Sequence, residues 1–233
     1  MIWINGIQLK GNVWVFGDSL SAKYSNPDTN PWGNAYIEWK GYEPKIYGDI
    51  IAEKYNLQHI NRGIPGADNY TIFESLCKEV DNIGKDDMII VGWSELSRFR
   101  IINHNGYWKR LAGNKKETKQ NRKTEEHFVH LTNDIVDEIL ANRTLSQDVT
   151  TEIENWMKLL KKLYGSNIIF WNWKQDVQLQ LINCVTPENW PCSIKMETNN
   201  IIDDWHYSEE GHKIVADLLM HYHQTGNYKK EFI

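Results

Sequence analysis

Four short apolar runs along the chain predict β-strands. They cover residues 12–17, 59–62, 88–93 and 167–173, and the second run is the weakest. Their apolar residues are largely continuous rather than alternating with polar ones. This pattern is typical of strands that are buried on both faces, as in a parallel sheet.

Between these runs, apolar residues recur at spacings of three and four and predict amphipathic helices. Three such helices are expected around residues 46–55, 72–80 and 149–163, and Gly165 closes the third. A last helix is expected from the N-cap Ser208 to about Gly226. Alternating strands and helices predict an α/β fold, a three-layer α/β/α sandwich around a flavodoxin-like parallel sheet.

Two segments depart from this alternation. In residues 1–10, apolar and polar residues alternate on either side of Asn5-Gly6, and this pattern predicts a small β-hairpin. Residues 98–146 contain a polar stretch at 114–126 and a predicted helix around 135–140. We interpret residues 98–146 either as a surface loop with a packing helix or as a cap near a site. Without an internal repeat or linker, we expect one domain over residues 1–233, with this inserted region at about 98–146.

Composition narrows the possible partners. The 233 residues carry a net charge of −5 and a pI near 5.9, which argue against a nucleic-acid partner. No apolar stretch is long enough to cross a bilayer, and the start does not resemble a signal peptide. We therefore expect a cytoplasmic protein with no membrane partner.

The three cysteines follow no metal or redox spacing, and reduced thiols are favoured over a Cys184–Cys192 disulfide.

Two distant segments carry the residues of serine nucleophilic catalysis. Ser19 follows the first apolar run in a Gly-Asp-Ser turn, and His206 lies just before the last helix. A serine hydroxyl needs a base, and the base needs a carboxylate that fixes its tautomer. Asp203 and Asp204 both precede His206 and compete for that role. Taken alone, Ser19 is equally compatible with a helix N-cap.

These residues resemble the SGNH, or GDSL-type, serine hydrolase superfamily. Its first block is similar to Phe16-Gly17-Asp18-Ser19-Leu20-Ser21, and its second is similar to residues 61–67, with Gly66 at the oxyanion position. Its fifth block, Asp-x-x-His, matches Asp203 and His206. The resemblance implies an SGNH hydrolase fold and a catalytic triad of Ser19, His206 and Asp203, with no metal or organic cofactor.

The third block departs from the family pattern. Where the family carries Gly-x-Asn-Asp after the third strand, this chain has Gly92-Trp93-Ser94-Glu95. We expect Ser94 to replace the asparagine, so that an oxyanion hole would be formed by Ser19, Gly66 and Ser94. The alternative is that Ser94 is simply a serine at the end of a strand, with no role in an oxyanion hole. Arg98, four residues later, is expected either to bind an anionic part of a substrate or to pair with a surface acid.

The loop after Ser19 is rich in aromatic residues. Trp32 and Tyr36 are predicted to contact substrate, although the loop can equally fold on its own aromatic side chains.

The resemblance implies an esterase that forms an acyl-enzyme on a small-molecule or carbohydrate ester, and we favour O-deacetylation of a carbohydrate. A non-catalytic binding module and a lipid acylhydrolase are the alternatives. The order Gly-Trp-Ser in the third block also resembles the order found in hydrolase-like proteins of tailed phages.

Overall fold

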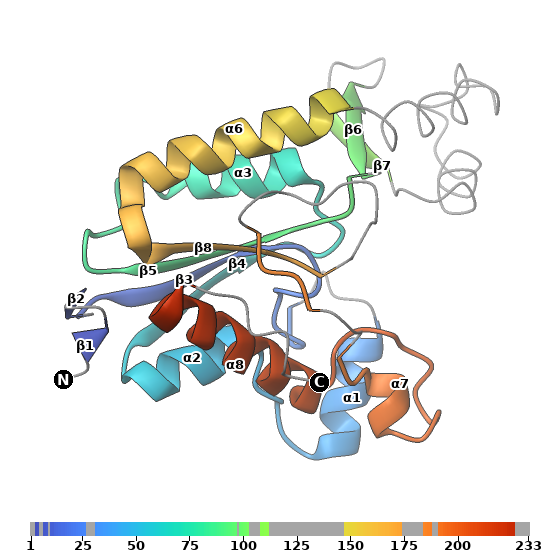
Figure 1. Ribbon diagram of the computed structural model, residues 1–233. Coiled ribbons are helices and arrows are strands. Elements are labelled where there is room, and N and C mark those ends of the chain that lie inside the picture. Colours follow the sequence, from blue (N-terminus) through green and yellow to red (C-terminus); the bar gives the residue numbers. More distant parts are fainter. Residues whose placement is uncertain are drawn as a thin grey trace.

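A four-stranded parallel sheet forms the centre of the molecule (Figure 1). This computed structural model describes residues 3–4, 7–8, 10–26, 31–96, 98–102, 108–111, 147–173, 184–187 and 191–226. The sheet has the order β4 (Gln58–Gly63), β3 (Asn12–Gly17), β5 (Met88–Trp93) and β8 (Ile168–Asn172). All three strand pairings are parallel, so the four predicted strands and their direction are confirmed.

Helices cover both faces of the sheet, which gives the predicted three layers (Figure 1). On one face, α2 (Tyr47–Tyr55) and α8 (Glu209–Thr225) pack over one set of strand residues, including Val15, Ile90 and Trp171. On the other, α3 (Asn69–Lys78) and α6 (Gln147–Tyr164) pack over the alternate set, including Phe16, Val91 and Phe170. Because both faces are buried, the central strands are apolar at nearly every position.

Local signals in the sequence fix the helix ends. The Asp68 carboxylate accepts a hydrogen bond from the Thr71 N–H at 2.8 Å and so caps α3. Ser208 caps α8 in the same way, through the Gly211 N–H at 3.2 Å. Gly226 ends α8 with a φ of 68°, a backbone conformation that glycine adopts without strain.

Two small antiparallel sheets lie outside the central one. β1 (Trp3–Ile4) pairs with β2 (Ile7–Gln8), which confirms the predicted N-terminal hairpin. β6 (Phe99–Ile102) pairs with β7 (Trp108–Leu111), inside the region expected to be an insertion. The polar stretch at 114–126 and the helix expected around 135–140 lie outside the described residues.

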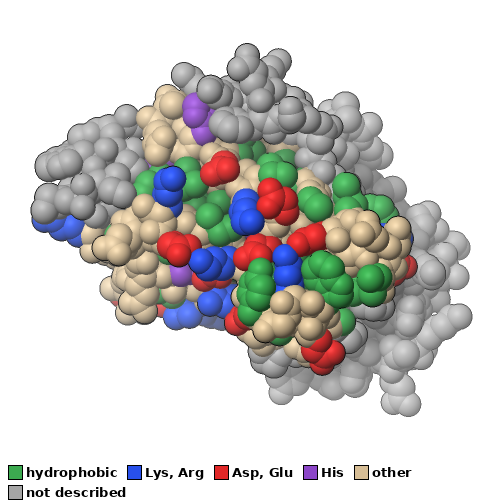
Figure 2. All heavy atoms as spheres, turned by 90° about the horizontal axis from the view of Figure 1, so that it is seen from below, with side chains coloured by type: hydrophobic (Ala, Val, Ile, Leu, Met, Phe, Trp, Pro, Cys, Tyr) green, Lys and Arg blue, Asp and Glu red, His purple; other side chains and the backbone are tan. Residues whose placement is uncertain are grey.

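Two short helices were not expected from the sequence. The aromatic segment after Ser19 was predicted as a loop, but its second half forms α1 (Pro31–Lys40). This helix lies beside α7 (Ile194–Glu197) (Figure 1). The Tyr36 hydroxyl and the Lys40 ammonium both donate to the Glu197 carboxylate, which joins the two helices. On the face seen from below the view of Figure 1, acidic and basic side chains intermingle over the surface (Figure 2).

Two other expectations concern cysteines and membranes. All three cysteines are free thiols, and Cys184 is buried. Burial raises the pKa of the Cys184 thiol well above its ordinary value. Over the described part of the chain, no helix combines the length and the apolar character needed to span a bilayer.

Candidate active site

Ser19 lies in a tight turn directly after β3. The Ser21 N–H donates to the Asp18 carbonyl at 3.0 Å, and the Leu20 N–H donates to the Asp18 carboxylate at 3.0 Å. The end of β4 presses against this turn: a Cβ on Gly63 would lie 2.6 Å from backbone atoms of Ser21 and Ala22. The turn is thus held at the carboxyl end of the sheet, where open α/β folds bind ligands.

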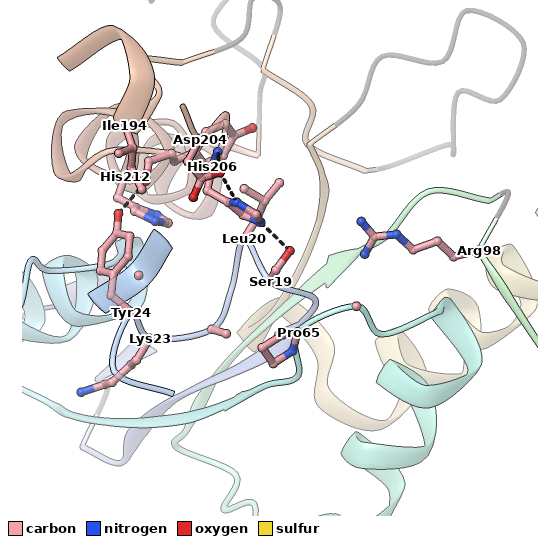
Figure 3. Close-up of a pocket in the computed structure, with 14 residues that line it drawn as sticks. Ser19, Leu20, Lys23, Tyr24, Pro65, Arg98, Ile194, Asp204, His206 and His212 are labelled. Carbon is pink, nitrogen blue, oxygen red and sulfur yellow. Dashed lines mark hydrogen bonds and ion pairs between the residues drawn. The ribbon is translucent and has the colours of Figure 1, made fainter. Parts of the chain in front are cut away.

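His206 brings the C-terminal part of the chain to this turn. Its Nε2 lies 2.9 Å from the Ser19 Oγ, within hydrogen-bonding distance (Figure 3). The histidine sits in the loop just before α8, so the capped start of that helix fixes its position. A neutral imidazole at this distance can accept the hydroxyl proton and activate the oxygen as a nucleophile.

The carboxylate that orients His206 belongs to Asp204. Its Oδ1 lies 2.7 Å from the His206 Nδ1 and also accepts the backbone N–H of His206 at 3.0 Å. The prediction that Asp203 lies against the histidine is wrong. The Asp203 side chain is 71% exposed and pairs with Lys195. Adjacent residues point in different directions, and the turn closed by Asp204 aims only the second carboxylate at the ring.

The environment of Asp204 favours its ionised form. The side chain is 8% exposed, and this burial raises its pKa. The hydrogen bonds and charge of His206, together with the backbone N–H groups of His206 and Trp205, outweigh burial and hold the pKa below its ordinary value. An ionised Asp204 keeps the proton of the neutral imidazole on Nδ1 and leaves Nε2 to face Ser19.

Ser94 directly follows β5, as expected, but its hydroxyl does not have the predicted role of an oxyanion donor. Its hydroxyl is fully buried and donates to the Asp18 Oδ2 at 2.9 Å. A hydroxyl has one hydrogen to donate, so Ser94 has none left for an oxyanion beside Ser19. Asn69 fixes its backbone through two further hydrogen bonds, accepting from the Ser94 N–H at 2.7 Å and donating to the Ser94 carbonyl at 3.1 Å.

A cavity of about 350 Å³ opens beside Ser19 (Figure 3). Gly66, the residue expected at the oxyanion position, lines it with a φ of 70°. The other lining residues are mostly apolar or neutral and come from both halves of the chain: Leu20, Ala22, Lys23, Tyr24, Gly33, Pro65, Arg98, Ile194, Asp204, His206, Tyr207 and His212. The cavity is therefore a chamber next to Ser19 in which part of a substrate can be held.

A second hollow, of about 310 Å³, also borders Ser19 and His206. Trp173, Trp205 and Asp203 line it together with Arg98. The Trp205 side chain is 58% exposed, and the Lys195 ammonium lies 5.0 Å from the centre of its ring. The hollow places aromatic and carboxylate groups next to Ser19.

The other substrate-binding predictions have mixed outcomes. Arg98 lines the cavity, but its pairing partner is the buried Asp18 rather than a surface acid. Tyr36 is fully buried and hydrogen-bonded to Glu197, so its ring is not open to a substrate. The side chain of Trp32 lies outside the described residues.

His212 is a cavity residue that the sequence analysis did not identify. Histidine side chains on helices are mostly solvated, but the exposure of His212 is 2%. Burial lowers its pKa to about 3, against the weaker opposing influence of the Asp49 and Glu209 charges. It is therefore a neutral ring at neutral pH. Its position could have been found from its spacing with Val215, Ala216 and Leu219 on the buried face of α8.

The family model for GDSL-like lipase/acylhydrolase proteins matches residues 13–219. The chain belongs to this family. The match begins in β3 and ends in α8, so it includes both Ser19 and His206. A GDSL-type protein of this kind is a serine hydrolase of the SGNH fold. Over the described residues, no three His, Cys, Asp or Glu side chains gather as metal ligands would.

Two solved structures are similar to this GDSL-family chain at low identity. One is a carbohydrate esterase whose active site displays divergent catalytic and non-catalytic binding functions; identity is 13%, coverage 95% of this chain and 70% of that one, and the TM-score 0.44. The other is a protein from Desulfitobacterium hafniense DCB-2 described as lipolytic and of the G-D-S-L family, with 12% identity, coverage of 89% and 97%, and a TM-score of 0.34. No curated protein matches the chain.

Proposed function

We propose that the protein is a serine esterase that works through an acyl-enzyme on Ser19. The Ser19 Oγ attacks the ester carbonyl carbon while its proton passes to the His206 Nε2. The carbonyl electron pair moves onto oxygen, then returns to expel the alcohol, which takes the proton from His206. Water repeats the sequence and frees the acid. The observation that carries this proposal is the hydrogen-bonded row of Ser19, His206 and Asp204.

A fluorophosphonate probe tests the nucleophile directly. We expect the wild-type protein to be labelled, with the label on the peptide that contains Ser19. Ser19→Ala should remove labelling and nearly all hydrolysis of p-nitrophenyl acetate, because no other group takes the place of the attacking oxygen. Ser25→Ala is the matched control, since this exposed serine contacts Glu43 and lies outside the cavity. An unlabelled wild type would favour the non-catalytic binding module instead.

The finer proposal is that the substrate is an O-acetylated carbohydrate. Its support is the hollow beside Ser19, where the half-exposed Trp205 and the exposed Asp203 lie together. The C–H faces of a sugar ring pack on an aromatic ring, and its hydroxyl groups donate to a carboxylate. In this proposal the sugar occupies that hollow and the acyl group enters the chamber near Leu20 and Tyr24.

Trp205→Ala tests where the sugar binds. We expect the KM for an acetylated oligosaccharide to rise roughly two- to tenfold, because a contact with an aromatic ring contributes about 0.5–1.5 kcal/mol. Hydrolysis of p-nitrophenyl acetate should change little. Trp39→Ala is the control: Trp39 is 43% exposed, stacks on Tyr36 and does not line either hollow. Equal KM values for wild type and Trp205→Ala would contradict the proposed sugar position.

A lipid acylhydrolase is distinguished by acyl-chain length. Rates that rise from acetate to octanoate p-nitrophenyl esters would favour it, and rates that fall would favour deacetylation. The single domain, the cytoplasmic location and the relation to phage proteins stay predictions from the sequence.

A further inference from the structure

The oxyanion site lacks the side-chain donor that the sequence led us to expect. Ser94 uses its hydroxyl hydrogen on Asp18, which leaves the backbone N–H groups of Ser19 and Gly66 as the expected donors. A negatively charged oxygen forms during attack, and each pre-positioned donor lowers the barrier substantially. The question is which other group borders the same space.

Arg98 is a cation that lines the same cavity as Ser19 and Gly66. It lines both the cavity and the second hollow, and Ser19 and His206 line both as well. In Figure 3 its guanidinium end points toward Ser19 from the side opposite His206. A guanidinium carries five N–H donors. Within the part of the chain that the structure describes, this group donates from Nη1 to the Asp18 Oδ2 at 3.1 Å.

Asp18 holds Arg98 in place. Its residue exposure is 1%, and besides Arg98 its carboxylate accepts from the Leu20 N–H, the Ser94 hydroxyl and the Trp173 indole N–H, the last at 3.1 Å. A carboxylate fixed from several sides gives the guanidinium a fixed anchor one residue from the nucleophile. The Arg98 side chain is itself only 21% exposed, so its charge is less screened than on an open surface.

We propose that Arg98 supplies the third oxyanion donor, in place of the asparagine of the family's third block. This inference rests on the proposed esterase reaction. As the bond from the Ser19 Oγ to the carbonyl carbon forms, the carbonyl electron pair moves onto its oxygen. Arg98 donates hydrogen bonds to that oxygen and keeps its protons, while the serine proton goes to His206. Ser94 acts one step away, by positioning the Asp18 carboxylate that anchors the guanidinium.

A neutral ester distinguishes an oxyanion donor from a site for substrate anions. With p-nitrophenyl acetate, Arg98→Ala should lower kcat by about 10²- to 10³-fold, the usual loss for one oxyanion donor, with little change in KM. Added guanidinium chloride at non-denaturing concentration should restore part of the rate. Arg98→Lys keeps a cation beside Asp18 and should fall between wild type and Arg98→Ala.

Arg62→Ala is the matched control, because Arg62 also pairs with a carboxylate, that of Glu79, and lies outside the cavity. A wild-type kcat for Arg98→Ala on the neutral ester would overturn the inference, and a loss confined to anionic esters would assign Arg98 to substrate binding. A lowered kcat without guanidinium rescue, in both Arg98→Ala and Arg98→Lys, would reduce Arg98 to a support for the turn. Failure of the wild type to react with fluorophosphonate would instead defeat the esterase proposal.

Discussion

At the scale of single residues, the site depends on which of two neighbouring aspartates faces the histidine. Asp204 contacts both the ring and the backbone N–H of His206, whereas Asp203 pairs with Lys195 in solvent. The buried carboxylate has its pKa lowered chiefly by His206 against the opposing effect of burial, so it stays ionised where the reaction needs it. The two residues are chemically identical, and only their surroundings separate their roles.

Exchanging each aspartate for asparagine tests this separation. Asp204→Asn should lower kcat by several powers of ten, up to about 10⁴-fold, because an amide can hold the imidazole in the wrong tautomer. With p-nitrophenyl acetate, which carries no sugar, Asp203→Asn should change kcat little, because the carboxylate that contacts His206 is that of Asp204 and the Asp203–Lys195 ion pair is exposed. Steady-state kinetics with p-nitrophenyl acetate measures both. A larger loss for Asp203→Asn would show that the orienting carboxylate is Asp203 in the working enzyme.

The sequence singles out Ser19 and His206, which the structure places within hydrogen-bonding distance, because each stands in a local pattern that the predicted chemistry requires. The family spacing favoured Asp203, and this choice was wrong because it depends on the turn before α8 and on Lys195. The hydrogen bond from Ser94 to Asp18 also could not be predicted from the sequence. It depends on a contact between residues 76 positions apart in the chain.

At the scale of elements, the nucleophile turn depends on close packing by the ends of two strands. Gly17 ends β3, and a Cβ there would meet the Ser21 side chain. Gly63 ends β4, and a Cβ there would meet backbone atoms that no change of rotamer can move. The geometry of Ser19 is therefore set partly by a neighbouring strand that carries no catalytic side chain.

Gly63→Ala should disturb the active site without changing any catalytic residue. The added methyl group forces the Ser21–Ala22 backbone to shift, which should lower the free energy of unfolding by about 1–3 kcal/mol and slow labelling of Ser19. Gly84→Ala is the control, because the nearest atom to its Cβ would be the Asp87 side chain at 3.6 Å. Denaturant unfolding and fluorophosphonate labelling rates measure the two effects. Equal behaviour of the two variants would mean that the turn tolerates the shift.

Elements differ in how well their own residues reveal them. The central strands are visible as continuous apolar runs because both of their faces are covered. β4 was the weakest prediction, and it is an edge strand whose residues are only partly buried. α1 was missed because its stability comes from tertiary contacts, among them Tyr36 with Glu197 and Tyr24, that local sequence does not display.

At the scale of the whole molecule, the layered fold places a neutral histidine in the wall of the active-site chamber. His212 projects from α8, and its ring lies among those of Tyr24, Tyr47 and Tyr207, at centroid distances of 5.7–5.8 Å. Forming the site therefore requires a histidine that stays uncharged inside the folded protein. Such a group makes stability depend on pH, because the unfolded chain can protonate it freely.

Native stability should consequently decrease as the pH falls below about 6.5, where an unfolded histidine begins to take up a proton. The folded protein binds that proton only near the lowered pKa of His212, about 3. Between these values the unfolded state holds more protons, so the free energy of unfolding falls by about 1.4 kcal/mol per pH unit for this residue. His223, whose pKa burial lowers to about 4, adds to the slope in the same direction down to that value. Urea unfolding of wild type and His212→Phe at pH 8, 6 and 5 measures the effect. The difference at pH 8 reports packing alone, and the variant should lose less stability on acidification; parallel curves would show that His212 is protonated in the folded protein.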